Sequence, residues 1–159
     1  MYNVLDICRY VINYSNSNFN GISNLKLQKI LYFIQAYFLT EKKEPCFSDK
    51  IEAWNFGPVV PKAYHEFKQY GAGNIPYITH YIEYDAKNLW TATYKTFNSD
   101  TILENDQHKI EFVLNTFANY SATDLVELTH NQAPWINAYA RGQNTEITIA
   151  EIREYFNEE

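Results

Sequence analysis

Apolar residues recur at helical spacing near the start of the chain. In residues 2 to 14 they occupy positions 4, 5, 8, 11 and 12, an i, i+3, i+4, i+7 pattern that predicts an amphipathic helix. The following run, Ser15–Gly21, is rich in Ser and Asn, which favour turns, and it predicts a loop.

A second helix is predicted from about Leu25 to Thr40, capped by Ser23 or Asn24. It is apolar on nearly every side, which is typical of the buried centre of a domain. Its few polar residues include Gln28, Tyr32 and Gln35, which fall on one side at i, i+4, i+7. This stripe either finds hydrogen-bond partners inside the fold or meets a binding partner.

The middle of the chain changes character. Residues 51–54 fit a short strand, and Gly57-Pro58 predicts a turn into a third helix over 59–70, with Gly71 as its stop. Residues 77 to 97 are rich in β-forming side chains around a polar break at 85–88, which predicts a β-hairpin.

Helical signals return in the last third. Thr101-x-x-Glu104, Ser121-x-x-Asp124 and Thr148-x-x-Glu151 each resemble a capping box, and Pro134 suits the first turn of a short helix through Ala140. We therefore expect a single domain over 1–159 of the mainly α (α+β) class, with a buried central helix and a small β-hairpin or sheet.

Composition and charge narrow the function. The 159 residues are 46% apolar and 20% charged, and the net charge of −6 argues against a general nucleic-acid binder, which neutralises phosphates with Lys and Arg. Lysines gather in the first half and carboxylates in the second, which favours a basic protein partner or is ordinary surface charge. The N-terminus lacks signal-peptide character and no apolar run is long enough for a membrane span, so a cytoplasmic protein is expected.

Motifs of catalysis, phosphate binding and metal binding are missing from the sequence. None of the four histidines pairs with another at a spacing that suits a metal, and no cofactor is expected. Cys46 could form a nucleophile pair with His65 or His130, but a buried, inert cysteine is far commoner. Tyr64, His65 and Glu66 are adjacent on a helix and therefore do not converge.

Aromatic residues make up 17% of the chain, and Tyr and Trp suit protein-binding surfaces. We expect no catalytic residue and two alternative binding surfaces. The first is the hairpin, with Tyr81, Tyr84, Trp90 and Tyr94. The second is a face around Tyr64, Lys68 and His130.

Three segments together resemble one known family. They are Asn24–Tyr37, then Glu52–Pro61 with Tyr64, Phe67 and Tyr70-Gly71 after it, and finally Leu128-Thr129-His130 with Pro134-Trp135. In this order they resemble the Panacea domain, also described as the SocA-like or GepA-like phage-associated domain. The resemblance covers about residues 2–140 and leaves a capped C-terminal helix, about 148–157, without an assigned role.

The resemblance implies a non-enzymatic, mainly helical antitoxin of bacteria and their phages that neutralises a toxin by direct contact. It implies that the recurrent residues are mainly structural and that residues 72–100 and the tail after Ala140 select the partner. These recurrent residues are Leu27, Gln28, Leu31, Trp54, Gly57, Pro58, His130 and Trp135. The alternatives are a phage-encoded inhibitor of a host defence protein such as a CRISPR nuclease, a proteolytic adaptor, or an enzyme using Cys46 or a histidine. The sequence leaves the oligomeric state and the identity of the partner open.

Overall fold

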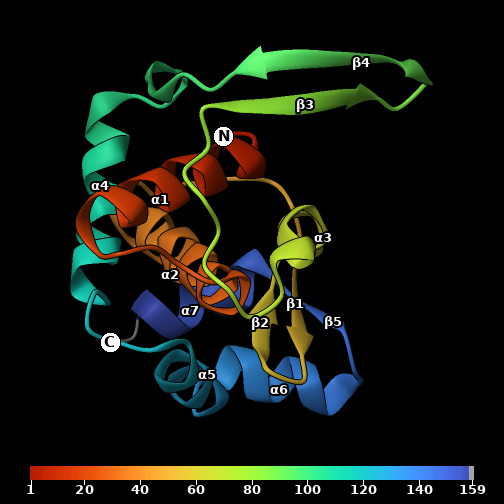
Figure 1. Ribbon diagram of the computed structural model, residues 1–159. Helices are drawn as coiled ribbons and strands as arrows, with labels where there is room; N and C mark the ends of the chain where they lie inside the picture. The colour runs from red at the N-terminus through yellow and green to blue at the C-terminus, as the bar shows by residue number, and fades with distance from the viewer. Residues whose placement is uncertain (158–159) are drawn as a thin grey trace.

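Helix α2 (Asn24–Glu41) runs through the centre of the molecule, and the other elements pack around it. The computed structural model describes residues 1–157 (Figure 1). Helices α1, α3, α4, α5 and α7 all contact α2, as does strand β2. The other helices are α1 (Val4–Asn18), α3 (Pro61–Phe67), α4 (Glu104–Thr116), α5 (Ala122–His130), α6 (Ala133–Arg141) and α7 (Ile149–Asn157). The predicted mainly helical α+β class is confirmed.

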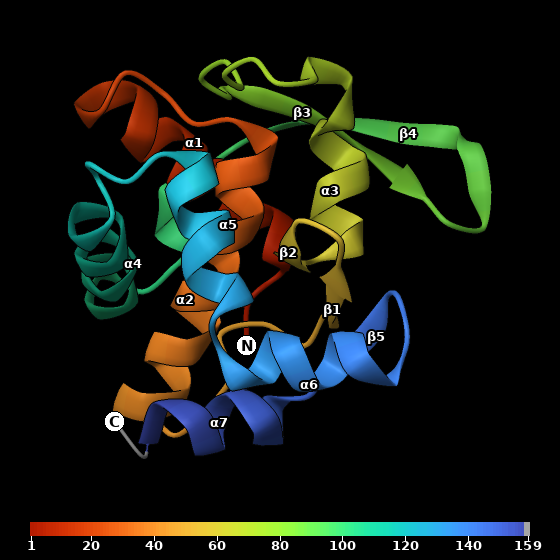
Figure 2. The same ribbon diagram turned by 90° about the horizontal axis from the view of Figure 1, so that it is seen from below.

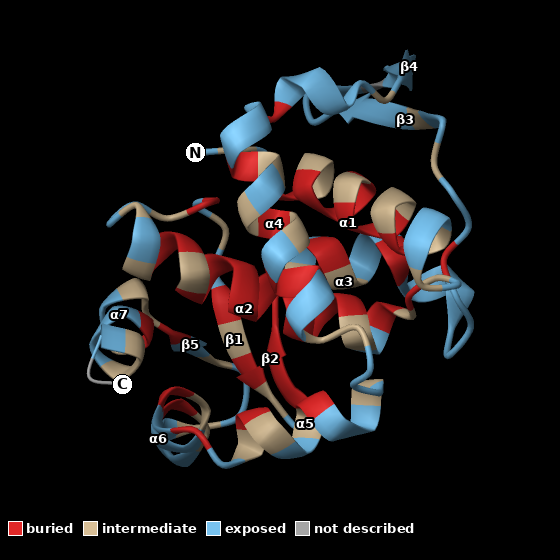
Figure 3. Cartoon of the chain, turned by 90° about the vertical axis from the view of Figure 1, so that its left-hand side faces the viewer, coloured by how far each residue is buried: buried red, intermediate tan, exposed pale blue. Residues whose placement is uncertain are grey.

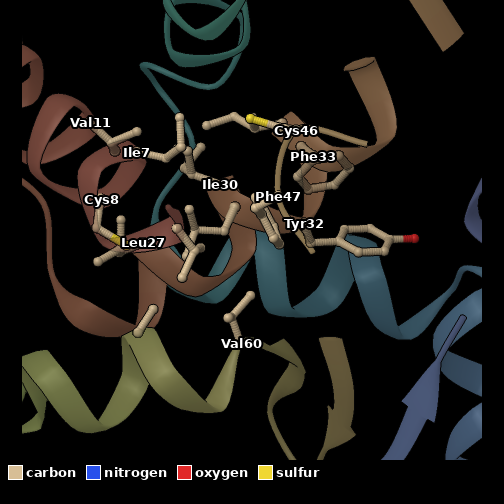
Figure 4. Packing of buried hydrophobic residues seen from close by; sticks show 14 of the residues in the cluster. Ile7, Cys8, Val11, Leu27, Ile30, Tyr32, Phe33, Cys46, Phe47 and Val60 are labelled. Carbon is tan, nitrogen blue, oxygen red and sulfur yellow. The ribbon is translucent and has the colours of Figure 1, made fainter. Parts of the chain in front are cut away.

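The central helix forms because its sequence is apolar on nearly every side and its first turn is capped. The Ser23 side chain accepts a hydrogen bond from Lys26 N at 3.3 Å, so Ser23 is the N-cap. Leu27 and Leu31 are fully buried, and Leu27 packs into the cluster that also holds Cys8, Cys46 and Phe47 (Figure 4). The expectation of a buried central helix is therefore confirmed.

The polar stripe of α2 is satisfied inside the fold. Gln28 Oε1 accepts from Val60 N at 3.0 Å, and the Tyr32 hydroxyl donates to Gln132 Oε1 at 2.9 Å. Gln35 Oε1 accepts from Cys46 N at 2.7 Å, while Gln35 Nε2 donates to Phe47 O. Of the two alternatives for this stripe, the structure supports the internal one, because each side chain holds a neighbouring loop or helix in place.

The described residues also form two small antiparallel sheets. In the first, β1 (Ile51–Trp54) lies between β2 (Gly57–Val59) and β5 (Thr145–Ile147), with Trp54 opposite Gly57 and Ala53 opposite Thr145. The second is the predicted hairpin, β3 (His80–Asp85) with β4 (Asn88–Thr96). Figure 2 shows the hairpin projecting beyond the helical body.

The predicted loop over Ser15–Gly21 is wrong in its first half. Helix α1 continues through Asn18. Its asparagine side chains form hydrogen bonds within the helix and to the backbone of a later segment of the chain, at Ile75. Asn16 Nδ2 donates to Ile12 O at 2.9 Å and to Ile75 O at 3.0 Å, and Asn18 Nδ2 donates to Tyr14 O. Local polar composition therefore mispredicts this boundary.

The predicted third helix over 59–70 is also wrong at its start. Residues 57–59 pair with β1 as a strand, and α3 begins only at Pro61, which suits the first turn of a helix. The helix continues as a 3₁₀ turn, Lys68–Tyr70, and Gly71 ends it with a φ of +56°. Because β2 is only three residues long and forms by pairing with β1, the local pattern does not separate it from the helix that follows.

Two of the three predicted capping boxes are confirmed. The Ser121 and Asp124 side chains each accept from the other residue's backbone N–H, and Thr148 and Glu151 do the same. The box at Thr101-x-x-Glu104 is wrong, because Ser99–Thr101 forms a 3₁₀ turn and α4 begins at Glu104 with Leu103 as its N-cap. Pro134 lies in the first turn of α6, as predicted.

In the described part of the chain, no helix has both the length and the apolar character to cross a membrane.

Candidate protein-binding surfaces

The turn between β1 and β2 is fixed by a glycine and two buried neighbours. Gly57 has a φ of +102°, a backbone conformation that L-residues with a side chain rarely adopt. A Cβ at this position would lie 2.6 Å from Lys29 Cε and 2.8 Å from Thr129 Oγ1. The chain therefore passes so close to α2 and α5 that only glycine fits.

Side chains from α5 and α6 hold the same turn from outside. His130 Nε2 lies 3.1 Å from Asn55 O, and the indole Nε1 of Trp135 donates to Trp54 O at 2.9 Å. The His130 and Trp135 rings lie 4.1 Å apart between centroids, and the Tyr139 hydroxyl donates to Asn55 Oδ1. These contacts leave Phe56 at the tip of the turn, with 63% of its surface exposed.

Lys29 lies directly beneath the turn. It is fully buried, and its Nζ donates to Pro58 O at 2.8 Å. Because burial penalises the charged ammonium, the pKa of Lys29 is lowered to about 7. None of the predicted site residues is Lys29, although a lysine within a helix that is apolar nearly all round is itself a signal.

A hollow of about 360 Å³ opens on the α3 side of the turn, and we call it the α3 hollow. It is lined by Asn24, Leu25, Gln28, Trp54, Asn55, Phe56, Val59, Tyr64, Lys68, Gly71 and Ala72. Trp54 and Tyr64 pack edge to face with ring centroids 5.0 Å apart. Of the predicted face around Tyr64, Lys68 and His130, the structure brings the first two together in this hollow, whereas His130 supports the turn and is not part of the lining.

The hairpin presents a separate aromatic surface. Asn13 anchors its base, since its side chain donates to Ile78 O at 2.8 Å and accepts from Ile78 N at 2.7 Å. Tyr81 faces the body, where the Arg9 guanidinium lies 3.4 Å from its ring centroid. Tyr84, Trp90 and Tyr94 are instead largely exposed, Trp90 at 96%. We call these three residues the hairpin aromatics; the fourth predicted residue, Tyr81, is half-buried against Arg9 and is not one of them. Figure 3 colours most of strand β3 as exposed, in contrast to the buried inner faces of the helices.

The geometry around the cysteines does not resemble that of an activated nucleophile. Burial raises the pKa of both thiols well above the ordinary range, which keeps them protonated. The charged neighbours of Cys46 are Asp106, Lys42 and the N-terminus, whereas His65 packs on the Trp54 ring and His130 binds Asn55 O. Within residues 1–157, no three His, Cys, Asp or Glu side chains are grouped so that they could hold a metal ion.

Fold and surface together describe a small helical protein that holds exposed aromatic residues on a fixed turn and a projecting hairpin. The family model described as "Antitoxin SocA-like, Panacea domain" matches residues 27–136, which is more than half of the chain, so the chain belongs to this family. It is also similar to the protein named Antitoxin SocA of Caulobacter vibrioides (strain NA1000 / CB15N), with 36% identity over 130 residues. That match covers 80% of this chain and 65% of the relative, so the chain spans just under two thirds of the relative's length. No solved structure matches the chain.

Proposed function

We propose that this protein is an antitoxin that neutralises a cognate toxin by direct, stoichiometric contact and without catalysis. Membership of the SocA-like Panacea family supports the proposal, as does the likeness to a protein that is itself named an antitoxin. The buried thiols are in keeping with it, because neither has the environment of a nucleophile.

The observation that carries the proposal is the exposure of the hairpin aromatics. Tyr84, Trp90 and Tyr94 are largely exposed on a two-stranded sheet that projects from the body. They are therefore not part of the hydrophobic core. Trp90 and Tyr94 are four residues apart on β4 and so share one face of the strand. Large exposed aromatic residues are costly in water and mark protein interaction sites, where Trp and Tyr dominate the binding energy.

The test begins by capturing the target from the native host with tagged protein and identifying it by mass spectrometry. Purified target is then titrated with the wild type and with Trp90→Ala. We expect activity of the target to be lost at an equimolar ratio, and Trp90→Ala to weaken binding by a factor of roughly 30, as for an interface hot spot of about 2 kcal/mol.

Phe112→Ala is the matched control, because Phe112 is another exposed aromatic residue, on α4 and away from the hairpin. It should bind the target like the wild type, and circular dichroism should show both variants folded. Inactivation of the target by substoichiometric protein, with many turnovers per molecule, would contradict the proposal. Loss of the target only in the presence of a cellular protease would contradict it in favour of an adaptor.

A further inference from the structure

The α3 hollow differs from the hairpin surface in shape and chemistry. It is a concave site of about 360 Å³, a volume suited to one side chain of a partner, and its walls are mostly apolar. The apolar part is formed by Leu25, Trp54, Phe56, Val59 and Ala72. The hairpin residues are not part of the lining, so the hollow is a second, separate surface.

The hollow is preformed. Its Trp54–Phe56 wall belongs to the turn that Gly57, His130 and Trp135 hold in place. Two of its amide side chains are already held, because Gln28 Nε2 donates to Asn24 Oδ1 at 2.8 Å and Asn24 Nδ2 donates to Tyr64 O at 3.1 Å. A ligand therefore meets a wall whose side chains are held in place before it binds, which lowers the ordering cost of binding.

Two hydrogen-bond donors on one wall remain free. Tyr64 and Lys68 are four residues apart across α3 and the 3₁₀ turn that follows it, so their side chains lie on one side of this helical segment. Among residues 1–157, neither the Tyr64 hydroxyl nor the Lys68 ammonium has a side-chain hydrogen bond or an ion pair. The hollow thus combines an apolar interior with one uncompensated positive charge and one free hydroxyl.

We propose that the α3 hollow binds the C-terminal residue of a partner polypeptide, with an apolar side chain in the hollow and the terminal carboxylate on Lys68 and Tyr64. The charge complementarity calls for an anion, and a carboxylate can accept from both donors at once. A C-terminal residue carries its carboxylate and its side chain on the same Cα, so a single residue satisfies a hollow of this size. An internal Asp or Glu would need a second residue to fill the apolar part.

The inference rests on the proposed function only in taking the ligand from a protein partner. It is tested without the toxin, by NMR titration of the isotope-labelled full chain with three probes. They are N-acetyl-phenylalanine, its C-terminal amide, and N-acetyl-phenylalanyl-aspartic acid α-amide, whose one carboxylate is that of the aspartate side chain. The free acid should shift the Trp54 indole, Lys68 and Gly71 signals and bind at least about 10-fold more tightly than either of the other probes. Trp54 is a useful reporter because its Nε1 donates to Glu52 Oε2 at 2.9 Å.

Variants separate the charge from the apolar contact. Lys68→Gln should remove the preference for the acid over the amide, and Tyr64→Phe should reduce it, while Lys62→Gln, an exposed lysine of α3 outside the lining, should leave it unchanged. Equal binding of acid and amide, tighter binding of the aspartic acid α-amide probe, or no shift at about 10 mM probe would each overturn the inference. Such a failure would leave toxin neutralisation intact, and loss of neutralisation in Trp90→Ala would leave this binding intact, so the two proposals fail separately.

Discussion

At the residue scale, Gly57 shows how one missing side chain permits the turn at the centre of the candidate surfaces. We predict that Gly57→Ala destabilises the protein by more than the 1 to 2 kcal/mol, roughly, of an unfavourable positive φ alone. The added methyl group would overlap Lys29 and Thr129 as well as strain the backbone. Urea denaturation measures the loss in the free energy of unfolding.

Gly71→Ala is the matched control for this substitution. Gly71 also has a positive φ, +56°, but a Cβ there meets nothing within 4 Å. It should therefore show the conformational cost without the steric one. Equal losses in the two variants would contradict the close packing of the turn on α2 and α5.

Lys29 is the second such residue, because its burial makes the stability of the protein depend on pH. Its pKa is about 7 in the folded protein against 10.5 as the ordinary value. Between these values the unfolded chain binds more protons than the folded one, so the free energy of unfolding should rise with pH, by at most about 1.4 kcal/mol per pH unit. We expect this rise between about pH 7 and 9.5, before tyrosines ionise in the unfolded chain.

The measurement compares wild type and Lys29→Met by chemical denaturation across this range. Methionine keeps the length of the side chain and removes the charge, so the contribution of Lys29 to the pH dependence should vanish. The difference between the two curves isolates this residue from Lys26, whose pKa is also lowered by burial. Parallel curves would show that the Lys29 ammonium is not buried as the structure places it.

At the element scale, α2 contributes most to the stability of the fold, because five helices and strand β2 pack against it. Leu31 is fully buried in its middle, so Leu31→Ala should cost about 2 to 5 kcal/mol of stability through the cavity left behind. Leu25→Ala, on the same helix but at its exposed N-terminal end, should cost much less. Thermal and urea denaturation compare the two, and an unchanged melting temperature in Leu31→Ala would contradict the central place of α2.

At the scale of the whole molecule, the net charge of −6 makes the encounter with a charged partner sensitive to salt. If the target is basic, as this charge favours, long-range attraction speeds the encounter and salt screens it. We predict that raising ionic strength from about 0.05 M to about 0.5 M lowers the association rate severalfold and changes the dissociation rate little. Stopped-flow fluorescence with the identified target measures both, and a salt-independent association rate would contradict electrostatic steering.

Sequence patterns alone determined the elements whose signals are local. The apolar α2 with its Ser23 cap, the boxes at Ser121 and Thr148 and the hairpin over 77–97 each depend on neighbours a few residues away. The motif order also led to the right family, whose model matches residues 27–136, a range that holds most of these motifs.

Only the tertiary structure decided what depends on residues distant in the chain. Strands β2 and β5 are three residues each and exist because β1 offers them hydrogen bonds from either side, so no local pattern predicts them. Lys29, Thr129 and Gly57 come together from α2, α5 and a turn, and the α3 hollow joins α2, β1 and α3. The sequence placed Tyr64, Lys68 and His130 on one face, whereas the fold puts the first two in the hollow and His130 against the turn. That division depends on how α5 packs against the turn, where His130 meets Asn55 O, a contact between residues far apart in the sequence.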